Sequence, residues 1–367
     1  MQKDFIVVDA HEDLAWNMFT FGRDYTQTVA VTRSLEASND TPTLNGDTLL
    51  GWDAYQNGRV AVVFASLFAS PTRRKEGDWD KQNYADGDEA YRLYREQADA
   101  YHRLFEQHPE KFTLIQTKDD LLTHIGRWER GDRADTTPVG LVILMEGAEC
   151  VREPDELTEW WQLGVRIIGP AWSGTRYCGG TGEPGPLTKE GYRLLDGMAE
   201  VGFTLDLSHM DEEAVMQALG HYPGRIIATH ANAKALIKDT SSNRFLSDRV
   251  LQGLLERNGI IGIVPYNRFL NWDWKPGKPR DMVSLDDVIA HIDYVCQMAG
   301  DALHVGIGSD ADGGFGLQSV PAGMDSIADL QKLAPLLEEK GYSEEDIKAV
   351  LGGNWIGLLE DTLPETR

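Results

Sequence analysis

Seven titratable side chains stand directly after short apolar runs of the sequence, where parallel strands would end. The run at Val7 ends in His11 and Asp13, and residues i and i+2 of a strand share a face, so these two side chains can converge on one point. Taken singly, each such residue is better explained as a structural histidine or a helix N-cap. Gathered at one edge of a sheet, they indicate a metal site. The other five are Glu146, His209, His230, Asp310 and Asp312.

The number of these side chains predicts how many ions they would hold. Three imidazoles and three or more carboxylates exceed what one tetrahedral zinc ion needs. Two divalent ions of the zinc class, about 3.5–4 Å apart and sharing a carboxylate, would use them all. Glu146 is our candidate for the shared ligand. We interpret the histidines in helical or loop contexts as structural: His102, His108, His124, His221 and His291.

Eight short β-rich runs are separated by amphipathic helical patterns, and most are continuously apolar, as parallel strands covered on both faces are. Alternation of strand and helix over eight units predicts an α/β fold, the (β/α)8 TIM barrel, with a doubly wound sheet as the alternative. Active sites of such barrels lie at the C-terminal ends of the strands, where the titratable residues stand. The runs begin at Phe5, Val60, Val139, Val165, Phe203, Arg225, Ile260 and Leu303.

A charged, Tyr-rich segment interrupts this alternation after the second predicted strand. We expect an insertion over about 72–112, with one long amphipathic helix over 88–112. Residues 72–86 before that helix are candidates for a lid or an oligomer contact. The chain shows no internal repeat and no low-complexity linker, so we expect one domain over 1–367.

The composition narrows the class of partner. The formal net charge is −24, which argues against nucleic acid or an anionic membrane as a partner. Three scattered cysteines give no disulfide framework, and the N-terminal residues lack the apolar core of a signal peptide. No apolar run approaches the length of a membrane span. We therefore predict a cytoplasmic location.

The strand-end motifs resemble those of a known family in the right order along nearly the whole chain. "DAHEDLAWN", "MEGAE", "LDLSHM", "ATHANAKAL" and "GIGSDADGGFG" are similar to the membrane (renal-type) dipeptidases, peptidase family M19, of the amidohydrolase superfamily. The resemblance implies that His11 and Asp13 bind one zinc ion and that His209 and His230 bind the other. It also implies that Glu146 bridges the ions. Dimers are common in the family, so a homodimer is a further expectation.

The resemblance also implies which residues meet the substrate. Asp310 would be the catalytic acid and base, and Arg244 in "SSNRFLSD" would hold the substrate's terminal carboxylate. At the fourth strand many members have a substrate-binding His in "LTLTH", whereas this chain has "GPAWS" and places Trp172 there. The segment after it offers Arg176 or Tyr177 to a reshaped pocket. Tyr266 completes our predicted substrate-binding residues.

Together, these expectations predict a zinc-dependent dipeptidase that hydrolyses the amide bond of dipeptides. A D-residue is possible at the C-terminal position of its substrates. The alternative is a binuclear amidohydrolase acting on an N-acyl-D-amino acid, a β-lactam or a cyclic imide. Deaminases share the fold but usually use one metal, and a barrel without chemistry would lack ligands. We expect Asp312, two residues beyond Asp310, to cap the following turn.

Overall fold

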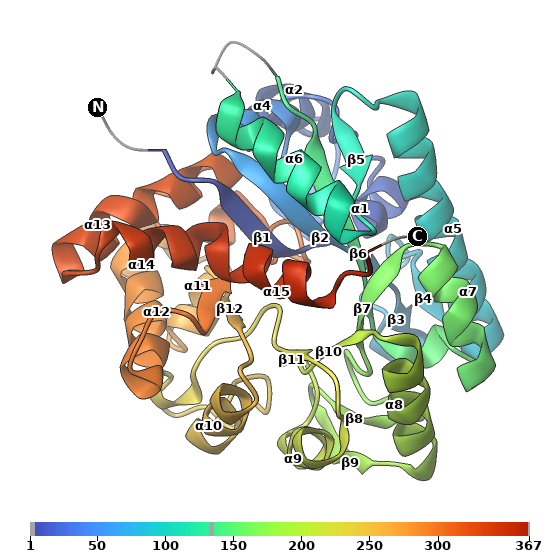
Figure 1. Ribbon diagram of the computed structural model, residues 1–367. Helices are drawn as coiled ribbons and strands as arrows, with labels where there is room; N and C mark the ends of the chain where they lie inside the picture. The colour runs from blue at the N-terminus through green and yellow to red at the C-terminus, as the bar shows by residue number, and fades with distance from the viewer. Residues whose placement is uncertain (1–3, 132–135, 366–367) are drawn as a thin grey trace.

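Eight parallel strands form the centre of the molecule, with helices around them (Figure 1). The computed structural model describes residues 4–131 and 136–365. Each of the eight apolar runs forms one strand, so the predicted strand positions are confirmed. The strands are β1 (Val7–Glu12), β2 (Val60–Phe68), β6 (Val139–Glu146), β7 (Val165–Gly169), β10 (Thr204–Asp206), β11 (Ile226–Ile227), β12 (Ile261–Ile263) and β13 (Val305–Ile307).

The eight strands close into a barrel in their order along the chain. Parallel pairing runs in the order β11-β10-β7-β6-β2-β1-β13-β12. The remaining gap, between β11 and β12, is bridged by Ala228, whose N–H donates to Ile260 O at 2.9 Å and whose carbonyl accepts from Gly262 N–H at 2.8 Å. This closure confirms the predicted (β/α)8 barrel.

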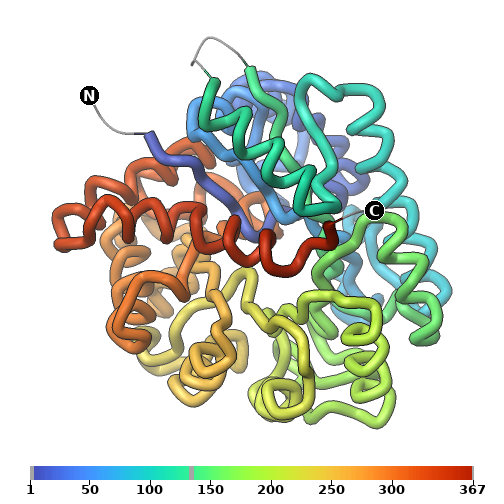
Figure 2. The backbone as a smooth tube through the Cα atoms, viewed as in Figure 1, coloured from blue at the N-terminus to red at the C-terminus, as the bar shows by residue number. Residues whose placement is uncertain are grey.

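The interior of the barrel is filled by alternate side chains of the strands. Trp355 of α15 (Asn354–Thr362) packs among these residues, and its indole N–H donates to Ile307 O at 3.0 Å. In Figure 2 this C-terminal segment, in red, runs beside the blue N-terminal strand. The interior side chains include Val8, Ala10, Val62, Phe64, Val142, Leu144, Ile167 and Ile227.

Helices cover the outside of the barrel at the predicted positions. Several of them begin at Ser, Thr or Asp N-caps: Thr188, Ser247 and Ser284 each accept a hydrogen bond from a first-turn N–H. Gly202 and Gly300 end two of them in the left-handed conformation. These helices are α7 (Leu157–Gln162), α8 (Lys189–Val201), α9 (Glu212–His221), α10 (Asp248–Glu256), α12 (Leu285–Ala299), α13 (Leu333–Lys340) and α14 (Glu344–Lys348).

The segment between β2 and β6 contains the expected insertion, with two differences. The long helix α5 (Gly87–Gln107) ends five residues before the predicted Phe112, because Pro109 disfavours helical geometry at His108. Phe112–Leu114 instead forms β5, a ninth strand that pairs with β6. The other elements here are β3 (Ser70–Pro71), the 3₁₀ turn Thr72–Arg74, β4 (Asn83–Tyr84) and α6 (Lys118–Arg130).

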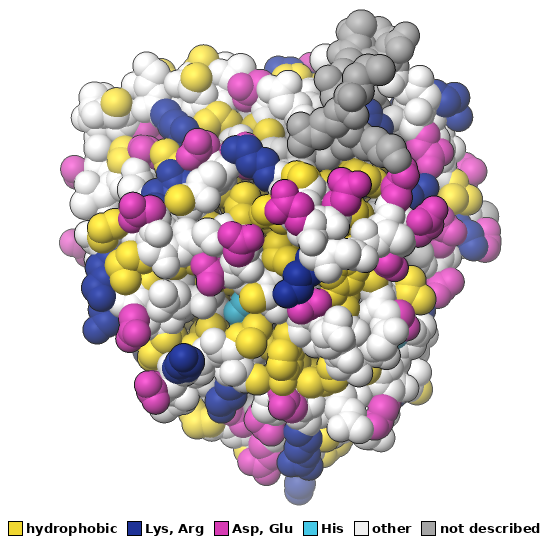
Figure 3. All heavy atoms as spheres, turned by 90° about the vertical axis from the view of Figure 1, so that its left-hand side faces the viewer, with side chains coloured by type: hydrophobic (Ala, Val, Ile, Leu, Met, Phe, Trp, Pro, Cys, Tyr) yellow, Lys and Arg dark blue, Asp and Glu magenta, His cyan; other side chains and the backbone are white. Residues whose placement is uncertain are grey.

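The cysteines, the helices and the surface charge can be compared with the expectations from composition. Cys150, Cys178 and Cys296 are buried and free. Among the described residues, none of the helices combines the length and apolarity needed to span a bilayer. On the face in Figure 3, acidic side chains lie scattered among basic ones instead of in one block. The remaining helices and strands are α1 (Leu14–Thr20), α2 (Val29–Glu36), α3 (Thr41–Leu44), α4 (Trp52–Asn57), β8 (Cys178–Gly180), β9 (Glu183–Leu187) and α11 (Asn267–Leu270).

Candidate active site

A β-bulge in β1 turns His11 and Asp13 towards the barrel axis. Val8 and Ala10 already face the interior, so simple alternation would point His11 outward. The register against β2 shifts between Asp9 and Glu12, which is the signature of an extra residue in one strand. Glu12 therefore faces outward. Asp13 lies beyond the end of β1, so the shared face expected for His11 and Asp13 arises from this irregularity.

The six predicted chemistry-bearing residues lie together at one end of the barrel. Glu146 is at the centre: its Oε2 lies 3.4 Å from His11 Nε2, and its Oε1 lies 3.1 Å from His209 Nε2 and 3.4 Å from His230 Nε2. His11 Nε2 also lies 3.6 Å from Asp13 Oδ1 and 3.9 Å from Asp310 Oδ1. One carboxylate thus contacts both halves of the cluster, as a bridging ligand would.

The electrostatics of the cluster match a site for cations. Burial lowers the pKa of His209 to about 4, with the nearby Arg244 charge adding to the effect, and burial also lowers that of His230. Both imidazoles are therefore neutral at pH 7 and keep a lone pair for a metal. Burial alone would raise the pKa of Glu146, but the His11 charge and the surrounding imidazoles hold it well below its usual range.

Further hydrogen bonds orient the histidines. Thr229 Oγ1 lies 2.9 Å from His230 Nδ1 and donates to Asp206 Oδ2 at 2.6 Å. Thr181 Oγ1 lies 2.9 Å from His209 Nδ1. Partners of this kind fix the ring orientation of metal-binding histidines. They leave the Nε2 atoms of His209 and His230 directed at Glu146 and at each other, 3.0 Å apart.

These residues fit a divalent metal. Both ring nitrogens of His11 are buried and have no hydrogen-bond partner among the described residues, an arrangement that burial makes costly unless another group satisfies them. Imidazole and carboxylate donors together suit zinc and similar ions. Three overlapping sets have all donor atoms within 4.8 Å: His11/His230/Asp310, Glu146/His209/His230 and His11/Asp13/Glu146.

Two residues of the cluster have backbone conformations that are rare outside glycine. His209 has φ +67° and Asp310 has φ +55°. Such left-handed residues cost free energy and persist where the surrounding structure holds them in place, often at active sites. Each lies three residues beyond the last residue of its strand, where the left-handed turn places its side chain in the cluster at the barrel end. Burial raises the pKa of Asp310 well above its usual range, and the charges of Asp13 and Glu146 add to this shift.

Arg244 lies beside the cluster with most of its donors unused. It is 4% exposed, and its Nη2 donates to His230 O at 2.7 Å. Its Nε and Nη1 are buried and have no partner among the described residues. A buried guanidinium with free donors is a receptor for a carboxylate, which it can bind through two hydrogen bonds.

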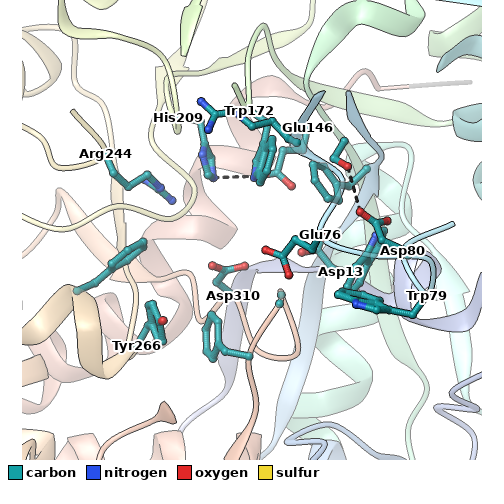
Figure 4. A pocket seen from close by; sticks show the side chains of 18 residues that line it. Asp13, Glu76, Trp79, Asp80, Glu146, Trp172, His209, Arg244, Tyr266 and Asp310 are labelled. Atoms are coloured by element: carbon teal, nitrogen blue, oxygen red, sulfur yellow. Dashed lines mark hydrogen bonds and ion pairs between the residues drawn. The ribbon is translucent and has the colours of Figure 1, made fainter. Parts of the chain in front are cut away.

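A cavity of about 240 Å³ joins Arg244 to the cluster. Trp172 and Tyr266, which we expect to bind the substrate, both line it (Figure 4). The Trp172 ring lies 6.1 Å from that of His209 and 5.2 Å from that of Phe68. Tyr266 stacks on Phe315 with ring centres 4.4 Å apart. The predicted site residues are therefore brought together in one place.

Two expectations about neighbouring residues are wrong. Arg176 and Tyr177 do not line this cavity: Arg176 Nε pairs with Glu149 Oε1 at 3.1 Å, and the Tyr177 hydroxyl donates to Val151 O. Asp312 does not cap the turn after it. Its buried carboxylate accepts from Leu49 N–H and Thr48 Oγ1 and pairs with Arg23 Nη1 at 2.9 Å.

Sequence reasoning missed much of the cavity wall. Residues of the segment after β2, which we expected to be a lid or an oligomer contact, also line the cavity. Trp79 lies against Trp16, with ring centres 6.3 Å apart. Nothing in the local pattern marks these positions, because their placement depends on how the segment folds over the barrel. The missed lining side chains are Trp16, Phe68, Ser70, Arg74, Glu76, Trp79, Asp80, Phe269 and Phe315.

Solved structures of known peptidases share this architecture. A metallopeptidase from Rhodobacter sphaeroides, solved with a phosphinate mimic of the dipeptide L-Ala-D-Ala, is 25% identical with a TM-score of 0.76, and the match covers 98% of this chain and 100% of that one. The M19 metallopeptidase called dipeptidase AC is 24% identical with a TM-score of 0.74, covering 98% of this chain and 99% of the other. The likeness to dipeptidase AC shows that the two chains share a fold.

Sequence comparison gives the same family. Dipeptidase verJ from Clonostachys rogersoniana is 27% identical over 316 residues, which are 83% of this chain and 73% of the relative. The family model described as membrane dipeptidase (peptidase family M19) matches residues 1–363. The chain therefore belongs to the membrane dipeptidase family, peptidase family M19, and is a metal-dependent dipeptidase of that family.

Proposed function

We propose that this enzyme holds two zinc-class ions and uses them to hydrolyse dipeptides, including those with a D-residue at the C-terminal position. His11 and Asp13 would hold one ion, His209 and His230 the other, and Glu146 both. The central position of Glu146 between the two pairs supports this division. The Rhodobacter relative with an L-Ala-D-Ala mimic supports the D-residue.

The chain's own side chains divide the remaining work. Ions bound here would polarise the amide carbonyl and lower the pKa of water. Asp310 takes the proton of the attacking water and passes it to the leaving amine, the usual double role of a general base and acid. Its place beside His11 supports this assignment. Arg244 holds the carboxylate of the leaving residue and so sets the register of the substrate.

Trp172 shapes the pocket on the other side of the cluster. Its position against His209 and Phe68 places a large apolar face where many relatives have an imidazole. We propose that it changes which dipeptides are preferred and leaves the hydrolytic step in place. Trp172→His should accordingly redistribute activity across a dipeptide library without abolishing it.

The observation that carries the proposed function is the buried Arg244 with two unpaired donor nitrogens in the same cavity as the metal cluster. We expect amidation of a good dipeptide's C-terminus to lower kcat/KM about tenfold or more, because a charged bidentate contact is lost. Arg244→Ala should cause the same loss and make amidation nearly neutral in the variant. A zinc-loaded protein that cleaves amidated and free dipeptides equally well would refute the carboxylate clamp.

Equal cleavage of amidated and free dipeptides would make three other classes of amide the leading candidate substrates. These classes are N-acyl-D-amino acids, β-lactams and cyclic imides. A screen of dipeptides with L and D second residues, beside these three classes, separates the possibilities. A cytoplasmic location, a single domain over 1–367 and a homodimer stay predictions. Sedimentation analysis of the purified protein tests the dimer.

A further inference from the structure

The cavity has opposite charges at its two sides. Arg244 lies on one side and Glu76, from the segment after β2, lies on the other, with Asp310 between them (Figure 4). Figure 4 also shows the Glu76 side chain extending towards Asp310 and into the open space. A dipeptide is a zwitterion whose carboxylate and ammonium lie at its two ends. The charges of the cavity are therefore arranged as the charges of a dipeptide are.

Glu76 is an exposed acid that lines the cavity and lies outside the metal cluster. Within the described residues, its carboxylate has no hydrogen-bond or ion-pair partner. Asp13, Glu146 and Asp310 belong to the sets that fit a divalent ion. Asp80 also lines the cavity, but it is 4% exposed and lies 3.5 Å from Ser70 Oγ, so its carboxylate is less open to a ligand than that of the exposed Glu76.

The two arginines that precede Glu76 in the sequence do not neutralise its charge. Arg74 Nε pairs with Glu183 Oε1 at 3.0 Å, and Arg73 Nη2 pairs with Glu183 Oε2 at 2.7 Å. Both guanidinium groups are thus tied to β9. Glu76 is exposed at its surface, yet partial burial and the charge of Asp80 raise its pKa, so a cation bound beside Glu76 would stabilise its negative charge.

The segment that carries Glu76 is fixed at several points. The two arginines bind Glu183, and Ser70 N–H donates to Gln82 O at 2.9 Å. Trp79 stacks on Phe21 with ring centres 5.4 Å apart. These contacts hold the segment over the barrel end, so Glu76 is positioned before the substrate arrives.

We propose that Glu76 binds the free α-ammonium of the substrate and makes the enzyme selective for dipeptides over N-acyl amino acids. The inference rests on the proposed function, because it assumes a substrate whose carboxylate lies on Arg244 and whose amide lies at the metal cluster. A chain held at Arg244 and extending across the cluster ends on the Glu76 side. An N-acyl amino acid has no cation at that end and leaves Glu76 unpaired.

A matched substrate pair isolates this contact. Alanyl-D-alanine and propionyl-D-alanine differ only in the amino group. We expect the zinc-loaded enzyme to prefer the dipeptide in kcat/KM by about tenfold or more, as a charge-assisted hydrogen bond predicts. Glu76→Gln should remove most of that preference by lowering kcat/KM for the dipeptide and leaving the propionyl compound unaffected. Phosphinate analogues of the two substrates should show the same change in inhibition constant, which needs no turnover.

Asp78→Asn is the control variant. Asp78 is exposed on the same segment and does not line the cavity, so this change removes a charge of the same sign and should preserve the preference. Metal content of the Glu76→Gln protein, measured by elemental analysis, should equal that of the unmodified enzyme. If the Glu76→Gln and unmodified proteins preferred the dipeptide equally, the role of Glu76 would be overturned and the proposed dipeptidase function would stand. Absence of hydrolysis for every dipeptide would overturn the proposed function and this inference together.

Discussion

Two buried polar clusters lie two residues apart on the segment after β13, and they differ in how far the protein satisfies them. Around Asp312, the carboxylate oxygens accept from Leu49 N–H, Thr48 and Tyr25, and Arg23 pairs with the charge. Around Asp310, the His11 ring nitrogens have no hydrogen-bond partner among the described residues. The sequence "SDAD" gives both carboxylates the same appearance.

The difference shows how a structural cluster and a functional one can be told apart. Asp312 ties the segment between β1 and β2 to the barrel end, and each partner is part of the chain. The cluster at Asp310 combines the neutral His209 and His230 with carboxylates and leaves the ring nitrogens of His11 without a hydrogen-bond partner among the described residues, a costly arrangement unless a ligand completes it.

Asp310→Asn should have the largest effect, and the effect should be on turnover. Removing the group that moves the proton lowers kcat by about 10²–10⁴-fold, while the stability of the fold stays near that of the unmodified protein. Steady-state kinetics with the best dipeptide measures the loss, and elemental analysis checks that metal is retained. Near-normal turnover in the variant would assign the proton transfer to another residue.

Asp312→Asn should reverse this pattern. The amide carries no charge for Arg23, and breaking a buried ion pair costs about 3–5 kcal/mol, with the lower end expected because Glu36 also binds Arg23. Urea denaturation of the metal-free proteins measures the free energy of unfolding. At temperatures where the variant is folded, its kcat should be close to normal. A stable variant with impaired kcat would place Asp312 in the catalytic machinery.

His291 provides a third, smaller test, because it is a buried imidazole outside both clusters. Its Nδ1 accepts from Ala233 N–H at 3.2 Å, and burial lowers its pKa to about 4. An unfolded histidine binds its proton near pH 6.5, so folding stability is full above that pH and falls as the pH drops from about 6.5 to 4, by about 2–3 kcal/mol.

His291→Asn isolates this contribution, since the amide oxygen can accept the same hydrogen bond. As the pH drops from about 6.5 to 4, the unmodified protein should lose unfolding free energy relative to the His291→Asn variant. Added zinc should leave the difference unchanged, because His291 is no part of the metal cluster. An identical pH dependence in both proteins would contradict the assigned pKa.

Much of the fold and site followed from local sequence patterns. Continuous apolar runs mark strands buried on both faces, and the residue that follows each run must lie at the active end of a barrel. This reasoning placed Glu146 and His230, and family resemblance placed Arg244. The roles of these residues in binding and catalysis stay predictions.

The features that local patterns missed depend on tertiary structure. The bulge that turns His11 inward shows only in the register against β2. The segment that carries Glu76 and Trp79 is held at the cavity by the ion pair of Arg74 with β9 and by the ring contact of Trp79 with α1. Both contacts join residues far apart in the sequence. Asp312 was expected to act within its own turn, whereas its partners lie over 260 residues earlier in the chain.

A metal titration of the apoenzyme, followed by hydrolysis of a dipeptide, tests the proposed two-ion site most directly. Zinc is added in steps to protein stripped with a chelator, and bound metal and kcat/KM are measured at each step. We predict that activity rises until about two ions are bound per chain and that His209→Ala binds one fewer and stays inactive. Full activity at one ion per chain, or dipeptide hydrolysis without metal, would contradict this prediction.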